Sequence, residues 1–394
     1  MIKNQLMRPC PVCRNEVGAE RLHTQEFVLP ENHPLPAAYD VVACGRCGFV
    51  YADTPAGQDA YDRYYADMSR YDMNYTCPES SLYADRAAWI DSFIRDRTDS
   101  IIDIGCGNGL LLLELQKRGL SDLTGLDPSE ACVSALRKKG IPGTISSIFS
   151  VSTDRAYDGA VLSGVLEHIC DVGGVMDTAK RLLKHGGQLF VCVPDASRYR
   201  FFDAVPFDYF NIEHINHFEE TSLINLGLQH GFHMSTFLKT TITLARTTQP
   251  MIFCVYENAG QTAGDMRSYA RNAVVHYIEQ TKKRAGIHRV LDELAETGEE
   301  VIVWGAGNYT SRLLADSSLG RCNIVLIVDN DPHKQGTRIG GRAVHSPQAI
   351  LDAGMTRTIL IAAAVFGDEI AAEIRHMGLQ NKIISLGNSG ERSA

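Results

Sequence analysis

The feature that most constrains the fold is a regular alternation of apolar runs and amphipathic stretches in the middle of the chain. Strands and helices are expected in turn at residues 100–106, 110–119, 122–129, 130–140, 157–169, 174–187 and 188–195. Strands that alternate with helices of this length predict a parallel, doubly wound sheet of the α/β class. Two later apolar runs, 233–245 and 250–257, are the expected closing strands of that sheet.

A second alternation begins near residue 300. Its strands and helices are expected at residues 301–307, 310–318, 323–331, 358–364 and 369–378. A charged helical stretch, 264–299, separates the two series. We therefore expect a second, Rossmann-like α/β fold at the C-terminal end.

A glycine turn follows the first of these strands, in the sequence IIDIGCGNG. Gly105, Gly107 and Gly109 open a helix at a point where the backbone must take positive φ or approach a ligand closely. Asp103 precedes the turn, and Asp127 ends the next strand twenty-two residues after Gly105. The GxGxG spacing differs from the GxGxxG of dinucleotide-binding folds, and Asp127 is placed to accept hydrogen bonds from ribose hydroxyls. The alternative is that Asp127 is only an exposed turn acid.

Two CxxC pairs lie in the first 64 residues. They are Cys10 with Cys13 and, after a spacer of thirty residues, Cys44 with Cys47. Each pair places two thiolates on one tight turn, and four thiolates fit the tetrahedral coordination of Zn²⁺. Such a site leaves no open coordination position, so we expect zinc to fold the segment without taking part in chemistry. Two unrelated pairs, or redox disulfides, are the alternative.

The segments DIGCGNG, GLDPS, YDGAVLSGVLEHI and LLKHGGQLFVCVPD occur in this order between residues 100 and 195. In sequence and spacing this series resembles the class I S-adenosylmethionine (SAM)-dependent methyltransferases, and the resemblance extends to about residue 245. It implies that the glycine turn, with Asp103 before it, packs against the methionyl part of SAM and that Asp127 holds the ribose.

Methyl transfer requires an aligned nucleophile and, where that nucleophile carries a proton, a base. Candidate bases should lie at the carboxyl ends of the strands, where open α/β sheets bind ligands. His168, beside Glu167, ends one strand, and Glu213, His214 and His217 lie in the aromatic segment FDYFNIEHINHF. Such surroundings suit a desolvated pocket in which the histidine pKa is tuned for proton transfer. A histidine without a chemical role, and an ordinary loop or helix cap, are the respective alternatives.

The layout of the whole chain is similar to that of the three-domain, zinc-containing C-methyltransferases of deoxysugar biosynthesis, which methylate nucleotide-linked keto-sugars. The resemblance implies that a base removes the proton next to the ketone and that the enolate takes the methyl group. It places the Glu-His pair of this family on Glu213 and His214, its strand-end histidine on His168, and its tyrosine on Tyr75, with Tyr71 as the competitor. We expect His214 to be the base, with Tyr75 and His168 stabilising the enolate.

The resemblance predicts four regions: a zinc-binding domain over 1–64, a methyltransferase domain over 65–250, a helical connector over 251–299, and a substrate-anchoring domain over 300–394. Two departures from the family lie where substrate should bind. TTITLARTTQP stands where a His-Gly-Gly-Ser-like turn is expected, and GAGNYTSRLL lacks the usual lysine. O- or N-methylation of a sugar or another small metabolite therefore remains open.

The later glycine turn, VIVWGAGNYTS, raises the alternative of a regulatory protein that binds NAD. Asp329 follows this turn at the distance of a ribose-binding acid, but Tyr309 or Thr310 stands where the third glycine is expected. We expect the turn to be structural, or to approach a phosphate of the substrate.

Charge and hydropathy limit the partners. The chain has 38 lysines and arginines against 47 acidic residues, which argues against a general nucleic-acid binder. It has no apolar run near the ~20 residues of a membrane span, and no N-terminal stretch of signal-peptide type. We expect a cytoplasmic enzyme with a small-molecule substrate, such as a nucleotide-sugar.

Overall fold

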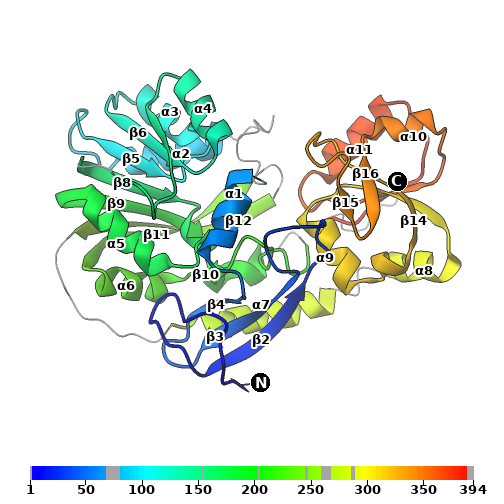
Figure 1. Cartoon of the computed structure of the whole chain (residues 1–394), viewed down its shortest axis with the longest axis horizontal. Coiled ribbons are helices and arrows are strands. Elements are labelled where there is room, and N and C mark those ends of the chain that lie inside the picture. Colours follow the sequence, from blue (N-terminus) through cyan, green and yellow to red (C-terminus); the bar gives the residue numbers. More distant parts are fainter. Residues whose placement is uncertain are drawn as a thin grey trace. The chain divides into compact units, whose positions relative to one another are not determined.

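The computed structural model describes residues 2–67, 80–152, 155–202, 205–244, 247–258, 268–284 and 289–387. The chain forms two compact units (Figure 1). The first unit comprises Met1–Leu22, Val41–Phe202 and Glu213–Val275. The second unit comprises His23–Asp40, Asp203–Ile212 and His276–Ala394.

A seven-stranded sheet forms the centre of the first unit, in the order β11-β12-β9-β8-β5-β6-β7. The strands are β5 (Ile101–Ile104), β6 (Leu123–Asp127), β7 (Gly143–Ile145), β8 (Tyr157–Ser163), β9 (Leu183–Pro194), β11 (Phe232–Leu244) and β12 (Thr247–Asn258). Strands β5 to β9 are parallel, and β11 and β12 form an antiparallel pair at the edge, as expected. The strand order reverses between β5 and β8, and the carboxyl ends at such a switch point are where open α/β sheets bind ligands.

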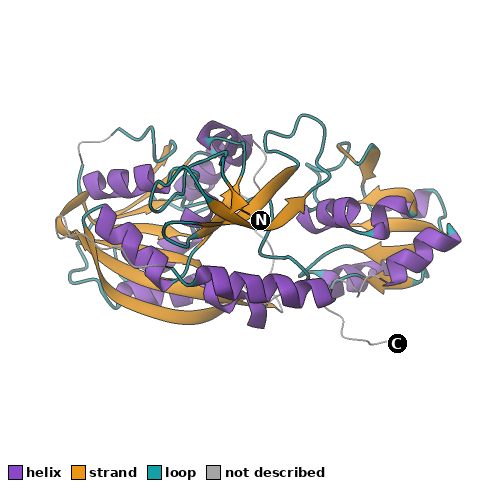
Figure 2. Cartoon of the chain, turned by 90° about the horizontal axis from the view of Figure 1, so that it is seen from below, coloured by secondary structure: helices purple, strands orange, loops and turns teal. Residues whose placement is uncertain are grey.

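Helices pack on both faces of this sheet (Figure 2). They are α2 (Ser80–Asp91), α3 (Leu110–Lys117), α4 (Glu130–Lys138), α5 (Val172–Leu182) and α6 (Glu220–Gln229). Alternate strand residues face opposite cores: Ile101 packs in the core that contains α2, α3 and α4, and Ile102 packs in the core that contains α5 and α6. This division explains why the strands read as continuous apolar runs.

A five-stranded sheet contains the N-terminal strands, in the order β1-β2-β3-β4-β10. The strands are β1 (Ile2–Lys3), β2 (Ala19–Glu26), β3 (Ala38–Cys44), β4 (Val50–Asp53) and β10 (Asn216–His217), and helix α1 (Gln58–Asp67) follows β4. β10 comes from the segment with the Glu-His pair and pairs antiparallel with β4. Residues 1–64 therefore do not form a compact unit of their own, and they are divided between the two units.

The second unit contains a six-stranded sheet in the order β15-β16-β14-β13-β17-β18. Its strands are β13 (Glu300–Trp304), β14 (Asn323–Val328), β15 (Arg338–Ile339), β16 (Arg342–His345), β17 (Thr358–Ile361) and β18 (Ile383–Ser385). Its helices are α8 (Arg289–Thr297), α9 (Asn308–Asp316), α10 (Gln348–Asp352) and α11 (Gly367–His376), with the 3-10 turn η4 (Ser318–Arg321). Every strand pair except β15–β16 is parallel, as the second alternation predicts.

Two element boundaries differ from those expected. Strand β12 extends to Asn258, beyond the expected domain end at residue 250, because its ladder with β9 continues to Glu257. The helix expected over 174–187 ends at Leu182, and Gly186 takes a φ of 74° within the strand that follows. Helix α7 (Ala270–Arg284) accounts for much of the predicted charged stretch. Within the described residues, no helix is both long and apolar enough to cross a bilayer.

Candidate active site

The first glycine turn has the conformation that its sequence requires. Gly105, Gly107 and Gly109 have φ values of 75°, 51° and 79°, which other residues rarely adopt. A Cβ on Gly105 would lie 2.8 Å from Val165, and one on Gly109 would collide with Leu136. The turn therefore needs glycine both for its backbone and for its space, and Val165 brings the end of β8 directly against it.

Asp127 joins the glycine turn to the next helix. Its Oδ2 accepts a hydrogen bond from the Gly107 N–H at 2.9 Å, and its Oδ1 accepts one from the Ser129 N–H at 2.9 Å. Burial raises the pKa of Asp127, and these two hydrogen bonds act in the opposite direction. Each oxygen keeps a second lone pair, so the carboxylate can also accept from a ribose diol.

Asp103 lies one strand away on β5 and is 3% exposed. Burial raises its pKa to about 7, and the charge of Asp127 adds to the effect. The positive charge of Arg86 acts in the opposite direction.

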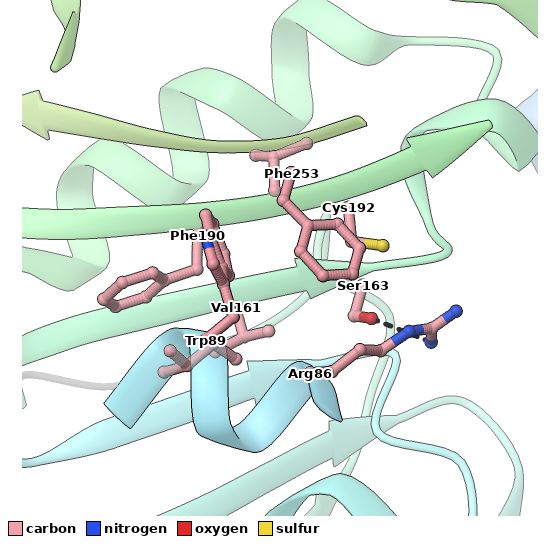
Figure 3. Close-up of a pocket in the computed structure, with 9 residues that line it drawn as sticks. Arg86, Trp89, Val161, Ser163, Phe190, Cys192 and Phe253 are labelled. Atoms are coloured by element: carbon pink, nitrogen blue, oxygen red, sulfur yellow. Dashed lines mark hydrogen bonds between the residues drawn. The ribbon is translucent and has the colours of Figure 1, made fainter. Parts of the chain in front are cut away.

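Arg86 is a residue that the sequence did not single out. It projects from α2, and its Nη1 donates to Ser163 Oγ at 3.0 Å (Figure 3). Figure 3 shows the guanidinium at the Ser163 end of a small cavity whose other end is filled by aromatic rings, including Trp89 and Phe190. The sequence carried no signal for this position, because arginine on a helix is usually a solvated surface residue.

His168 ends the 3-10 turn η1 (Leu166–His168), which follows β8. Its Nδ1 lies 3.1 Å from the Glu213 carbonyl oxygen. A carbonyl only accepts, so we assign the proton to Nδ1 and a lone pair to Nε2. Nε2 lies 4.0 Å from Glu167 Oε1.

His214 lies beside His168, with ring centroids 4.8 Å apart. Burial lowers the pKa of His168 to about 4 and that of His214 to about 3, so both rings are neutral near pH 7 and can accept a proton. Burial raises the pKa of Glu167 to about 7, so this side chain can hold a proton where an ordinary glutamate cannot. His168 and His214, two of the three predicted histidines, thus meet in one cluster with Glu167, in which His214 is half-buried.

Two tyrosines of α1 complete the cluster. The Tyr64 hydroxyl donates to Glu213 Oε1 at 2.6 Å, and the Tyr65 ring meets the His168 ring edge-on at 5.6 Å. Tyr75 and Tyr71, the tyrosines expected from the family resemblance, lie outside the described residues. His217 packs against Tyr199, with its Nδ1 3.4 Å from the hydroxyl.

Glu167, His168 and His214 also offer a possible ligand set for a metal ion, since one ligand atom from each lies within 4.8 Å of the others.

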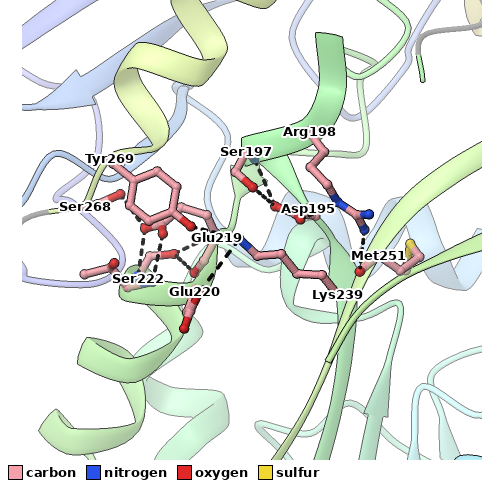
Figure 4. A network of polar contacts seen from close by, with 11 residues as sticks. Asp195, Ser197, Arg198, Glu219, Glu220, Ser222, Lys239, Met251, Ser268 and Tyr269 are labelled. Carbon is pink, nitrogen blue, oxygen red and sulfur yellow. Dashed lines mark hydrogen bonds and ion pairs between the residues drawn. The ribbon is translucent and has the colours of Figure 1, made fainter. Parts of the chain in front are cut away.

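The loop that carries Glu213 and His214 is anchored at its ends (Figure 4). Asp195 accepts from Ser197 N–H at 3.0 Å, and the Ala196 N–H donates to the Phe218 carbonyl at 2.8 Å. Glu219, which is 0% exposed, caps α6 and accepts from the Ser268 hydroxyl at 2.6 Å.

The four predicted cysteine ligands lie together. Cys10 Sγ is 3.6 Å from Cys47 Sγ, and Cys13 Sγ is 3.6 Å from Cys44 Sγ. All four sulfurs lie within 4.8 Å of one another. Tetrahedral zinc with bonds of about 2.3 Å separates its sulfurs by about 3.8 Å, so the cluster fits a structural zinc ion.

The second glycine turn is held by hydrogen bonds to side chains of the same unit. Asp329 Oδ2 accepts from the Ala306 N–H at 2.7 Å and from Lys334 Nζ at 3.2 Å. The Thr310 hydroxyl donates to the Gly305 carbonyl at 2.7 Å, at one of the two positions where a dinucleotide fold would carry its third glycine.

Comparisons with known proteins agree with the α/β fold of the first unit. Residues 80–236 match a family described as a methyltransferase domain, and residues 297–384 match one described as C2185-like, N-terminal. The ubiquinone biosynthesis O-methyltransferase of Stutzerimonas stutzeri is 32% identical over 113 residues, which cover 27% of this chain and 48% of that protein. An uncharacterised 37.1 kDa protein in transposon TN4556 of Streptomyces fradiae is 25% identical over 277 residues, which cover 61% of this chain and 75% of that protein.

Among solved structures, the geranyl diphosphate C-methyltransferase of Streptomyces coelicolor A3(2) is 10% identical, with a TM-score of 0.40. The match covers 51% of this chain and 97% of that one. The chain spans about half the length of the ubiquinone biosynthesis enzymes that it matches.

Proposed function

We propose that this protein, whose residues 80–236 form a class I SAM-dependent methyltransferase domain, methylates a carbon atom next to a ketone, and that its substrate is a nucleotide-linked keto-sugar. The observation that supports this reaction is the group of His168, His214 and Glu213, which follows Val165 of the glycine-turn contact and in which His168 is buried and the other two are half-buried. Transfer to a carbon needs a base that removes a weakly acidic proton, and two neutral imidazoles in a desolvated pocket supply one.

The cofactor-binding residues follow from the ends of neighbouring strands. Asp127 would accept from the ribose hydroxyls, and the glycine turn, which lacks side chains at Gly105 and Gly107, would let the methionyl part approach the backbone closely. We assign Arg86 to the methionyl carboxylate, since a guanidinium can bind a carboxylate by two hydrogen bonds. When bound, SAM supplies the electrophilic methyl carbon.

The base acts on the substrate. His214 takes the proton from the carbon next to the ketone. The electron pair of that C–H bond stays on the substrate, which becomes an enolate. A protonated Glu167 would donate a hydrogen bond to the enolate oxygen, and His168, whose Nε2 carries a lone pair, would act as a proton acceptor beside it. Tyr64 holds Glu213, whose carbonyl fixes the His168 ring. The cysteine cluster would hold zinc as a structural ion, and the second unit would bind the nucleotide part of the substrate.

O-methylation is the second candidate. It is favoured by the similarity to ubiquinone biosynthesis O-methyltransferases, which extends over 113 residues. In that case His214 or His168 would deprotonate a hydroxyl group.

Hydrogen exchange separates the two reactions. The full-length protein is incubated with a nucleoside-diphosphate-linked keto-sugar in deuterated water without SAM, and deuterium at the carbon next to the ketone is followed by NMR. We expect exchange by the wild type and a loss of about 10²–10⁴-fold in His214→Gln. Methyl transfer to a hydroxyl, without exchange on any keto-sugar tested, would favour the second candidate.

A further inference from the structure

Asn216 lies in β10, between the cysteine-rich segment and the turn that carries His168, and it is 1% exposed. Its Nδ2 donates to the carbonyls of Leu166 and Ile169, both at 2.7 Å, and its Oδ1 accepts from Arg8 Nη2. The two carbonyls can only accept, so the orientation of this amide is fixed by its partners. A single buried side chain therefore connects three parts of the first unit.

The two carbonyls bound by Asn216 flank the Glu167–His168 pair. The backbone reinforces this contact, because the Ile215 N–H donates to the Glu167 carbonyl at 2.8 Å. The Glu213 carbonyl accepts from the His168 ring at 3.1 Å. Residues 213–216 thus hold the turn at four points, one of which is the His168 ring itself.

Arg8 fixes the other side of Asn216. It stands two residues before Cys10, and its backbone N–H donates to Asp53 Oδ1 at 3.1 Å. Its guanidinium lies over the Tyr51 ring, 5.3 Å from the centroid. Tyr51 is also the β4 residue that pairs with Asn216, so the arginine and the strand approach the amide together.

We propose that Arg8 and Asn216 are positioning residues, which transmit the fold of the cysteine-rich segment to the orientation of His168. This inference rests on the proposed catalytic role of His168. It also gives the cysteine-rich segment a function in the reaction, although its own ligands do no chemistry. The segment would hold the histidine in the direction that proton transfer needs.

Asn216→Asp tests the two hydrogen bonds that the amide donates without removing the one that it accepts. The variant keeps the shape of the side chain and an acceptor for Arg8, but it loses both donors and faces two carbonyl oxygens. We expect kcat to fall by about 10²-fold, because small misplacements of reacting groups have effects of this size. The KM for SAM should stay unchanged. In the zinc-loaded full-length protein labelled with ¹⁵N-histidine, the ring signals of His168, assigned with His168→Gln, should shift.

The controls separate positioning from general destabilisation. Asn225→Asp introduces the same charge at an equally buried position in α6 and should leave the His168 signals unchanged. Arg8→Met should act like Asn216→Asp, and Arg8→Lys should restore part of the rate. Zinc content, measured by atomic emission, should be the same in all of them.

The NMR comparison does not depend on the identity of the substrate. If the wild type methylates no acceptor, the proposed function fails, but a His168 shift in Asn216→Asp and not in Asn225→Asp still supports positioning. His168 signals and kcat equal to those of the wild type in a folded Asn216→Asp protein would overturn the inference.

Discussion

Burial sets the protonation of His168 and His214, and this effect determines what the two residues can do. A solvated histidine is partly protonated near neutrality, whereas both of these rings are neutral at pH 7 because burial lowers their pKa. The same burial raises the pKa of Glu167 to about 7. One pocket thus contains proton acceptors and a proton donor at the same pH, a separation that general acid–base catalysis requires.

The sequence identified the histidines but not all of their partners. His168 ends a predicted strand, and His214 lies in an aromatic segment after the next one, so their residue type and surroundings predict proton transfer. Tyr64 and Tyr65 carried no such signal, because their approach depends on how α1 packs against residues more than a hundred positions later. Arg86 was missed for the same reason, since its contact with Ser163 spans 77 residues.

Arg86 should determine the affinity for the cofactor. In Arg86→Gln we expect the Kd for S-adenosylhomocysteine, measured by calorimetry, to rise roughly 10-fold, because a charge-assisted hydrogen bond contributes about 1.5–3 kcal/mol. Arg86→Lys should lie between the variant and the wild type. Arg95→Gln, on an exposed residue shortly after α2, is the matched control and should bind as the wild type does. An unchanged Kd in Arg86→Gln would remove the arginine from the cofactor site.

At the scale of elements, the local sequence predicts a helix, strand or turn correctly where the residues that determine it lie within the element itself. The run IIDI with its three glycines specifies β5, the turn and the start of α3. A similar contact occurs twice, one residue apart in the two turns: Asp127 accepts from the N–H of Gly107, and Asp329 accepts from the N–H of Ala306. β10 could not be predicted, because it consists of two residues that become a strand only by pairing with β4.

The pairing of β10 with β4 connects the cysteine-rich segment to the segment that carries Glu213 and His214. We expect the wild type to bind one zinc ion per chain and Cys44→Ser to bind none. Loss of the ion, in this variant or after treatment with a chelator, should lower the melting temperature, because metal binding and folding of such segments are coupled. The His168 ring signals should broaden or shift at the same time. Cys322→Ser, in the second unit, should keep the zinc and the signals. Melting and His168 signals that do not change after zinc loss would separate the two elements.

At the scale of the whole molecule, buried histidines govern the response to acid. Burial lowers the pKa of four of them from 6.5, to about 4 or about 3: His23, His168, His214 and His217. Between pH 6.5 and 4 the unfolded chain binds protons that the folded rings do not, so stability falls as the pH falls through this window. Asp103 and Glu167 act in the opposite sense. Their pKa values are raised to about 7, so their contribution is present at low pH and is lost as the pH rises toward 7.

Burial also raises the pKa values of Asp62, Asp127 and Asp316, which act in the same sense as Asp103 and Glu167. We expect the four histidines to outweigh these carboxyl groups, so that the melting temperature falls between pH 6.5 and pH 4.5. Scanning calorimetry should show a smaller fall in His23→Gln, which removes one of the histidines, and a larger fall in Glu167→Gln, which removes an opposing group. Zinc content must be followed at each pH, because protonation of the cysteines releases the metal, and only samples that retain it are compared. A melting temperature that rises on acidification, or a fall that is equal in all three proteins, would show that other groups dominate.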